Sequence, residues 1–230
     1  MSLPGLRGVL FDKDGTLFGF QQTWAPFAEA VIADLADRGA DPGEVAWTLG
    51  FDRDRRLYRP DSPVIAETAA EVARLLERFA PDDPPGLAAR LDRLAAGIAP
   101  VPATDLRAAL SPLAAAGLRL GVVTNDSAGA ARAHLVRAGV ADLFDPVIGY
   151  DSGHGGKPDP GPLLAGAAAW GLPPDRIAMV GDSAHDLVAG RAAGMVPVGV
   201  LTGPADRAAL APLARAVLPS IADLTDLLEL

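Results

Sequence analysis

The sequence predicts an α/β fold, a doubly wound, Rossmann-like parallel sheet with an inserted all-helical domain. Short apolar runs such as VLF at 9–11 alternate with helical patterns through the second half of the chain. Strands that are buried on both faces of a parallel sheet have this near-continuous apolar character. Residues 20–100 differ, because they carry helical patterns and almost no strand-like run. An insertion after the first strand is the simplest organisation that fits both observations.

The predicted sheet is built from apolar runs that are rich in β-branched residues. Its strands are expected at 9–12, 118–125, 146–150, 176–182, 197–203 and, more briefly, 216–219. Helices are expected between or after them at 104–116, 128–138, 160–170, 184–193 and 221–229. Thr104 and Ser127 can cap two of these helices, and glycines such as Gly139 end them.

The inserted segment is expected to hold helices at 24–39, 41–49, 62–79 and 84–98, joined by a loop at 51–60. Ser62 with Pro63 is a favourable start for the third helix, since serine caps a helix and proline suits its first turn. We therefore predict a core of residues 1–19 and 101–230 and a helical domain of residues 20–100.

Composition restricts the partners. The chain has 230 residues, no cysteine and a formal net charge of −9. Such an acidic chain repels nucleic acids and anionic membranes, so neither is an expected partner. The N-terminus lacks the layout of a signal peptide, and no apolar stretch approaches the roughly 20 residues that span a bilayer. We expect a cytoplasmic protein, either a monomer or a homodimer.

Polar residues follow the ends of several predicted strands. Asp12 and Asp14 follow the first strand, Thr124 and Asn125 end the second, and Asp182 ends the strand at 176–182. Ligands of open parallel sheets bind beyond the carboxyl ends of the strands. Two carboxylates about 5 Å apart repel by about 3 kcal/mol at an effective dielectric constant of 20. A divalent cation would relieve this repulsion through its positive charge. Hard oxygen ligands favour Mg²⁺ as that cation.

Four segments in this order resemble the haloacid dehalogenase superfamily of aspartate-nucleophile phosphatases, and most closely its phosphoglycolate-phosphatase-like branch. They are DKDGT at 12–16, VVTND at 122–126, GGKPDP at 155–160 and GDSAHD at 181–186. The resemblance covers nearly the whole chain. It implies that residues 20–100 form a helical cap over the carboxyl edge of the sheet.

The resemblance also implies a Mg²⁺-dependent phosphatase that hydrolyses small-molecule phosphate monoesters, with phosphoglycolate as the family-level candidate. Asp12 would be the nucleophile and Asp14 the general acid and base. Thr124, the Asn125 amide and Lys157 would bind the phosphate. The metal would be held by Asp12, the Asp14 backbone carbonyl and Asp182, with Asp186 acting through water or Lys157.

Several alternatives remain open at this stage. Asp12 to Thr16 could be a plain turn, Thr124 a local cap, Lys157 a solvated lysine and Asp186 a first-turn helix residue. Lys13 is expected to point to the side of the site. His154 and His185 could lie near the site, but a structural or exposed role is the preferred interpretation for each of the three histidines (His134, His154 and His185). A sugar phosphomutase of the same superfamily and a non-catalytic binding protein are the rival functions. Asp14 argues against a dehalogenase, and the absence of lysine from 20–100 argues against phosphonoacetaldehyde hydrolysis.

The inserted segment also carries candidates for substrate recognition. The loop at 51–60 contains four arginines, any of which could bind the leaving half of an anionic substrate. The competing interpretation is a solvated face paired with neighbouring aspartates, and we prefer it. Likewise, Trp24, Trp47 and Tyr58 could line a pocket, but core packing is the preferred interpretation. The arginines are Arg53, Arg55, Arg56 and Arg59.

Overall fold

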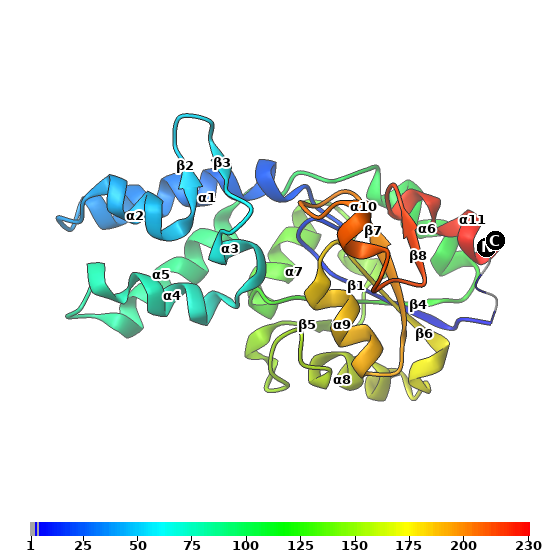
Figure 1. Ribbon diagram of the computed structural model, residues 1–230. Helices are drawn as coiled ribbons and strands as arrows, with labels where there is room; N and C mark the ends of the chain where they lie inside the picture. The colour runs from blue at the N-terminus through cyan, green and yellow to red at the C-terminus, as the bar shows by residue number, and fades with distance from the viewer. Residues whose placement is uncertain (1–2, 4) are drawn as a thin grey trace.

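A six-stranded parallel sheet forms the centre of the computed structural model, which describes residue 3 and residues 5–230 (Figure 1). The strand order is β5-β4-β1-β6-β7-β8, so the first strand of the chain lies in the middle. Phe11 at the end of β1 pairs with Val122 of β4 on one side and Val180 of β6 on the other. The strands are β1 (Gly8–Phe11), β4 (Arg119–Val123), β5 (Val147–Ile148), β6 (Ile177–Gly181), β7 (Val196–Val200) and β8 (Ala216–Leu218).

Helices cover both faces of this sheet, as the doubly wound prediction requires. Side chains alternate between the faces along each strand. Val9 and Phe11 pack with α6 (Leu106–Ala115), α7 (Ala128–Arg137) and α11 (Leu224–Leu228). Leu10 packs with α8 (Gly161–Trp170) and α9 (Ala184–Ala192). The short helix α10 (Arg207–Leu210), which the sequence did not predict, precedes β8.

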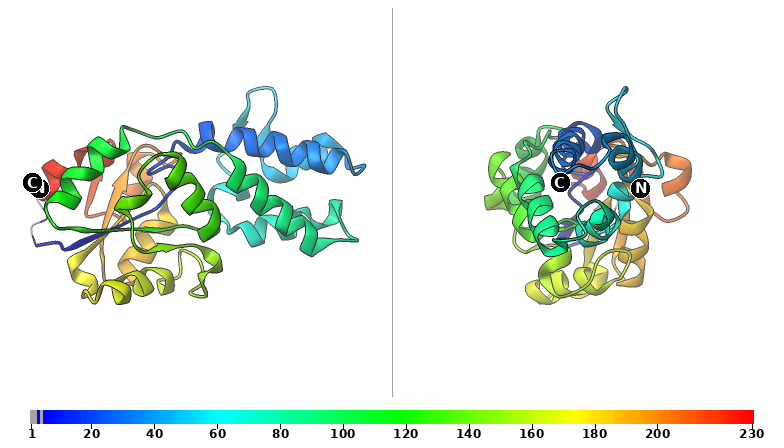
Figure 2. Two further views of the ribbon diagram at one scale, coloured as in Figure 1. Left: turned by 180° about the vertical axis from the view of Figure 1, so that it is seen from behind. Right: turned by 90° about the vertical axis from the view of Figure 1, so that its left-hand side faces the viewer.

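Residues 20–98 form a helical segment with a hydrophobic cluster of its own, at the end of the molecule opposite to the termini (Figures 1 and 2). Its helices are α1 (Phe20–Ala36), α2 (Pro42–Leu49), α3 (Pro63–Ala66), α4 (Ala69–Leu76) and α5 (Pro84–Gly97). Ala130 of α7 joins this cluster, so α7 is where the segment meets the sheet-bearing part of the chain. The division into two domains stays a prediction.

The helix predicted at 62–79 is wrong as a single element. Ser62 caps the short α3, but the chain then leaves helical geometry at Glu67. Thr68 begins α4 with a capping box, in which its hydroxyl accepts from the Glu71 N–H and the Glu71 carboxylate accepts from the Thr68 N–H. This reciprocal pair favours a new helix start over continuation of the old helix. A 3₁₀ turn over Glu77–Phe79 follows.

Two other local expectations are corrected. The loop at 51–60 contains a short antiparallel hairpin of β2 (Phe51–Asp52) and β3 (Leu57–Tyr58), so the segment is not entirely helical. Asp105, rather than Thr104, caps α6 by accepting from the Ala108 N–H at 3.0 Å. Further 3₁₀ turns lie at Ala141–Leu143, Tyr150–Ser152, Pro174–Arg176 and Ile221–Asp223. Within the described residues, none of the helices has the length and apolar character needed to cross a membrane.

Candidate active site

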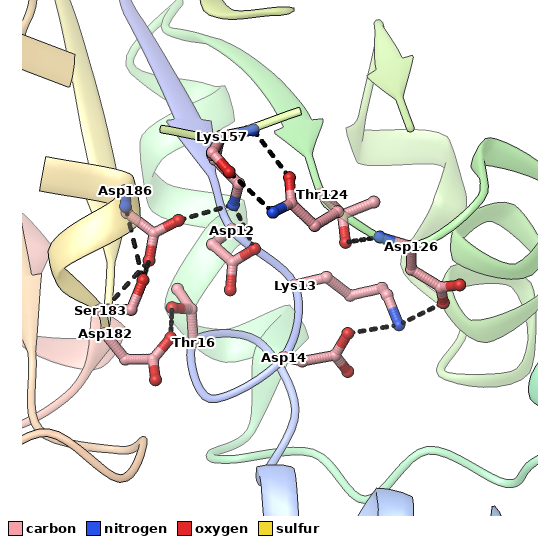
Figure 3. Close-up of polar contacts among 11 residues, drawn as sticks. Asp12, Lys13, Asp14, Thr16, Thr124, Asp126, Lys157, Asp182, Ser183 and Asp186 are labelled. Atoms are coloured by element: carbon pink, nitrogen blue, oxygen red, sulfur yellow. Dashed lines mark hydrogen bonds and ion pairs between the residues drawn. The ribbon is translucent and has the colours of Figure 1, made fainter. Parts of the chain in front are cut away.

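The carboxyl edge of the sheet brings the sequence-predicted site residues together (Figure 3). Asp12 follows the central strand β1, and its backbone N–H still donates to Val180 O at 2.8 Å. Thr124 follows β4 and donates in the same way to Ile148 O at 3.0 Å. Asp182 follows β6, while Lys157 comes from the loop before α8. Continued strand pairing up to the functional residue explains why these side chains have fixed positions.

Three carboxylates form a buried cluster with one ammonium group. Oxygens of Asp12, Asp182 and Asp186 lie within 4.8 Å of one another. Lys157 Nζ donates to Asp12 Oδ1 at 2.5 Å and to Asp186 Oδ1 at 2.6 Å. Burial opposes the charge on Lys157, but Asp12 and Asp186 outweigh burial and raise the pKa of the ammonium. Burial, with the charges of Asp186 and Asp14, raises the pKa of Asp12 to about 7 against the opposing effect of Lys157.

The cluster suits a hard divalent cation. One lysine cannot balance three buried carboxylates, and burial together with Asp12 and Asp186 raises the pKa of Asp182. A second cation would lower these pKa values by favouring the ionised carboxylates. Carboxylate oxygens without a sulfur or imidazole donor are the ligand set that Mg²⁺ prefers. The residues therefore fit the predicted metal.

Backbone atoms approach Asp182 unusually closely. A Cβ on Gly15, which has φ +86°, or on Gly203 would collide with the Asp182 carboxylate. Thr16 Oγ1 donates to Asp182 Oδ1 at 3.2 Å, and Thr202 Oγ1 donates to Gly15 O at 2.6 Å. Only residues without a side chain fit at 15 and 203, and this leaves the Asp182 carboxylate confined on two sides.

Asp186 is held from both sides. Its Oδ2 accepts from Ser183 Oγ at 2.7 Å and from Ser183 N at 3.1 Å, which makes a capping box at the start of α9. Its Oδ1 accepts from Lys157. Both oxygens of Asp186 are bound by the protein. The same side chain therefore caps the start of α9 and contacts Lys157.

The side chain of Asp14 belongs to a second network rather than to the carboxylate cluster of Asp12, Asp182 and Asp186. Lys13 Nζ lies 2.8 Å from Asp14 Oδ2 and 3.1 Å from Asp126 Oδ2. Lys13 is fully buried and points away from Asp12, as Figure 3 shows. Burial opposes its charge, but Asp14 and Asp126 outweigh burial and raise the pKa of Lys13. Asp14 Oδ1 is buried and has no hydrogen-bond partner among the described residues.

His134 links this network to the helical segment. Its Nδ1 lies 3.0 Å from Lys13 Nζ, and its Nε2 lies 2.9 Å from the carbonyl oxygen of Ala95 in α5. These partners assign an unprotonated Nδ1 that accepts from Lys13 and an Nε2–H that donates to Ala95. Burial and the charge on Lys13 lower the pKa of His134 to about 4. His134 is thus a buried neutral histidine.

Thr124 and Asn125 are tied into the loops around the site. Thr124 Oγ1 accepts from the Asp126 N–H at 3.1 Å. The Asn125 side chain binds the backbone of Lys157 twice, accepting from its N–H at 2.8 Å and donating to its carbonyl at 2.9 Å. This pair of bonds fixes the loop that carries Lys157, a role that the sequence did not reveal.

A pocket lies between the sheet edge and the helical segment. Its lining includes Asp12, Asp14 and Lys157 on one side and Trp24 and Leu91 on the other. The arginines of the loop at 51–60 are not among the lining residues: Arg59 stacks on Trp47 at 4.3 Å and pairs with Asp61. Tyr58 is buried in the helical segment and donates to Trp24 O at 3.0 Å. Of the three aromatic candidates, only Trp24 reaches the pocket.

Sequence reasoning missed the network around Asp14. Lys13 lies beside the Asp12 cluster as expected, but its contact with Asp14 was not foreseen. Asp126 was given no role, although it stands inside the VVTND segment, and His134 was expected only to be structural or exposed. The available signal was the rarity of lysine, since Lys13 and Lys157 are the only two in the chain.

Comparisons with known proteins identify the family of the chain. Residues 6–194 match the family described as haloacid dehalogenase-like hydrolase. The chain is 35% identical to a phosphoglycolate phosphatase of Rhodospirillum rubrum over 96% of this chain and 90% of that protein. It is 38% identical to a phosphoglycolate phosphatase of Neisseria meningitidis, over 89% of this chain and 84% of that protein.

The fold has a solved counterpart in a predicted phosphoglycolate phosphatase from Haemophilus somnus, with a TM-score of 0.72 and 21% identity. That match covers 96% of this chain and 97% of the other. The family match covers more than half of the chain. The phosphoglycolate phosphatases of Rhodospirillum rubrum and Neisseria meningitidis are more than 30% identical to it over most of their own length. The chain belongs to the haloacid dehalogenase-like hydrolases, in their phosphoglycolate-phosphatase-like branch.

Proposed function

We propose that this protein is a Mg²⁺-dependent phosphatase that hydrolyses small phosphate monoesters through an aspartyl-phosphate on Asp12. The family and its phosphatase relatives make the chain a hydrolase of phosphoric monoesters. One observation carries the proposed mechanism: the Asp12 carboxylate lies at the end of the central strand, within a cluster that suits a cation and beside Lys157. Phosphoglycolate, named for the relatives, is the first substrate to test.

In the first step, an Asp12 oxygen attacks phosphorus in line with the leaving oxygen. A bond forms between phosphorus and Asp12, and the bond between phosphorus and the leaving oxygen breaks. Asp14 gives its proton to that oxygen, which leaves as an alcohol. In the second step, Asp14 takes a proton from water while the water oxygen attacks phosphorus, and the bond to Asp12 breaks.

Asp14 is suited to this task by its two unlike oxygens. Lys13 binds Oδ2, whereas Oδ1 is without a partner and is left for the proton transfer. General acid–base catalysis by one positioned group contributes about 10²–10⁴-fold.

Phosphate would be held by Thr124, by the Asn125 amide and by Lys157, the last two being fixed to each other through the Asn125 side chain. Lys157 would balance negative charge on the transferring group, as such electrostatic groups do in phosphoryl transfer. Asp12, the Asp14 carbonyl and Asp182 would hold Mg²⁺, which when bound supplies further charge to the phosphoryl oxygens. Asp186 would act through water or through Lys157.

Residues 20–100 would form a cap domain on a core of residues 1–19 and 101–230. Its helices contribute Trp24 and Leu91 to the pocket above Asp12, so the cap excludes water and selects the ester. We place the enzyme in the cytoplasm as a monomer or homodimer with no macromolecular substrate.

The test is phosphate release from p-nitrophenyl phosphate with Mg²⁺ and with a chelator, for the wild type and Asp12→Asn. We expect hydrolysis that requires Mg²⁺ and is lost in Asp12→Asn. Activity that survives this substitution would refute the mechanism. Transient phosphorylation of Asp12 by a sugar phosphate, with return of phosphate to sugar, would instead indicate a mutase.

A further inference from the structure

Apolar side chains form much of the pocket wall opposite Asp12 and Asp14. These side chains come from three helices, α1, α4 and α5, and we call them the cap wall: Phe20, Trp24, Phe27, Val72, Leu91 and Ala95. All six are buried among the hydrophobic residues of the helical segment. The group of an ester that leaves from phosphorus must lie on this side, since the phosphate end is occupied by Asp12, Thr124 and Lys157.

The charges that line the pocket on this side are negative. Asp92 of α5 and Glu67, between α3 and α4, line it, and no arginine is among the described lining residues. Lys157, the lysine of the lining, is already paired with Asp12 and Asp186. His185 is the remaining nitrogen base there, and Glu67 is an acidic neighbour of it. A carboxylate on the leaving group would meet two acids and lack a dedicated cation.

The cap wall has one polar side-chain atom, the indole nitrogen of Trp24. Trp24 lines the pocket, and its buried indole Nε1 has no hydrogen-bond partner among the described residues. An indole N–H carries no charge, so it does not supply the countercharge that a buried carboxylate needs. The cavity of about 80 Å³ has room for several waters, and therefore for a small molecule.

We propose, on the basis of the phosphatase function proposed above, that the preferred substrate is a small phosphate monoester whose leaving group is uncharged and mainly apolar. Phosphoglycolate, whose leaving group carries a carboxylate, is then a poor substrate. The cap wall and Asp92 select against it.

The test compares phosphoglycolate with isobutyl phosphate, which has the same number of heavy atoms but two methyl groups in place of the carboxylate oxygens. Both esters release a primary alkoxide, so the charge of the leaving group is the main difference. We expect kcat/KM for isobutyl phosphate to exceed that for phosphoglycolate at least tenfold. An equal or higher kcat/KM for phosphoglycolate would overturn the proposal.

Variants of Asp92 test the origin of this selectivity. We expect the ratio of kcat/KM for isobutyl phosphate to kcat/KM for phosphoglycolate to fall severalfold in Asp92→Asn and further in Asp92→Lys. The first substitution removes a negative charge from the pocket lining, and the second also adds a positive one. Asp82→Asn and Asp82→Lys make the same charge changes at an exposed cap residue outside the pocket lining. They should leave the ratio as in the wild type, and a similar fall in both series would refute a local effect of Asp92.

Binding separates this proposal from the phosphatase function. Calorimetric affinities of both esters for Asp12→Asn give the same ratio without turnover. If p-nitrophenyl phosphate is not hydrolysed but isobutyl phosphate binds at least tenfold tighter than phosphoglycolate, the phosphatase function fails and the pocket preference stands. If p-nitrophenyl phosphate is hydrolysed but phosphoglycolate binds as tightly or more tightly, the function stands and the preference fails.

Discussion

Replacing Lys13 by methionine should destabilise the protein strongly. Methionine keeps the unbranched shape of the side chain but removes the ammonium that lies 2.8 Å from Asp14 and 3.1 Å from Asp126. Lys13 is fully buried, and Asp126 is only 7% exposed. The substitution therefore leaves two carboxylates in one buried volume without a cation, and it removes the donor to His134 Nδ1.

The size of the loss follows from this burial. Removing one partner of a buried ion pair costs about 3–5 kcal/mol, because the remaining charge keeps its desolvation penalty. A loss of this size lowers Tm by roughly 6–20 °C, at about 2–4 °C per kcal/mol for a protein of this length. An exposed pair is worth only about 0–1 kcal/mol. Arg55→Met, which breaks the exposed pair with Asp52, is therefore the matched control.

Urea unfolding at neutral pH, followed by circular dichroism, gives the free energy of unfolding of each variant. The double variant Lys13→Met/Asp126→Asn should recover at least about 1 kcal/mol relative to Lys13→Met, since it removes one unpaired carboxylate. A loss below about 1 kcal/mol in Lys13→Met, within the range of an exposed pair, would refute the argument. So would strictly additive effects in the double variant.

Three further predictions concern His134, the metal and Gly203. Because folding lowers the pKa of His134 from 6.5 to about 4, its contribution to stability is present above 6.5 and is lost as the pH falls towards 4. Between pH 7 and pH 5, urea unfolding should show the wild type losing about 2 kcal/mol more than His134→Gln, and equal losses would contradict this. Saturating Mg²⁺ should raise the Tm of the wild type. At a Mg²⁺ concentration of 100 times Kd, binding adds about 2.7 kcal/mol to the free energy of unfolding. Asp182→Asn should reduce that rise in Tm. A wild-type Tm that does not change with Mg²⁺ would exclude the proposed Mg²⁺ site. Gly203→Ala should lower Mg²⁺-dependent turnover because its Cβ would displace the Asp182 carboxylate, while Gly129→Ala, which has open space around it, should leave turnover unchanged. Equal turnover in both glycine variants would contradict the confined geometry of Asp182.

The fold could be predicted from the sequence because its evidence is local. Each buried strand is an apolar run such as VLF at 9–11, and the runs of β1, β4 and β6 are followed by Asp12, Thr124 and Asp182 on the same sheet edge. The break in the helix predicted at 62–79 was also locally encoded, since Thr68 and Glu71 have the spacing of a capping box. There the apolar periodicity on both sides of the break outweighed the weaker capping signal.

The surroundings of the catalytic candidates could not be predicted in the same way. The charged partners of the loop at 51–60 are near in sequence, so the pattern alone could not tell whether its arginines face solvent or substrate. The partner of Lys13 in α7, His134, is 121 residues away in sequence. Nothing local to DKDGT reveals that contact, because it depends on where α7 and α5 meet.

Both lysines of the chain are buried, and each binds one of the two aspartates proposed to react. Lys157 binds Asp12, and Lys13 binds Asp14. The other basic residues, apart from histidine, are arginines, none of which the described pocket lining includes. A compact ammonium can donate in three directions, whereas guanidinium is a planar fork that matches one carboxylate. Lys13 has three separate partners in Asp14, Asp126 and His134, an arrangement that an ammonium satisfies and a planar fork does not. At position 13 the geometry of the site therefore suits lysine better than the arginine that the chain uses almost everywhere else.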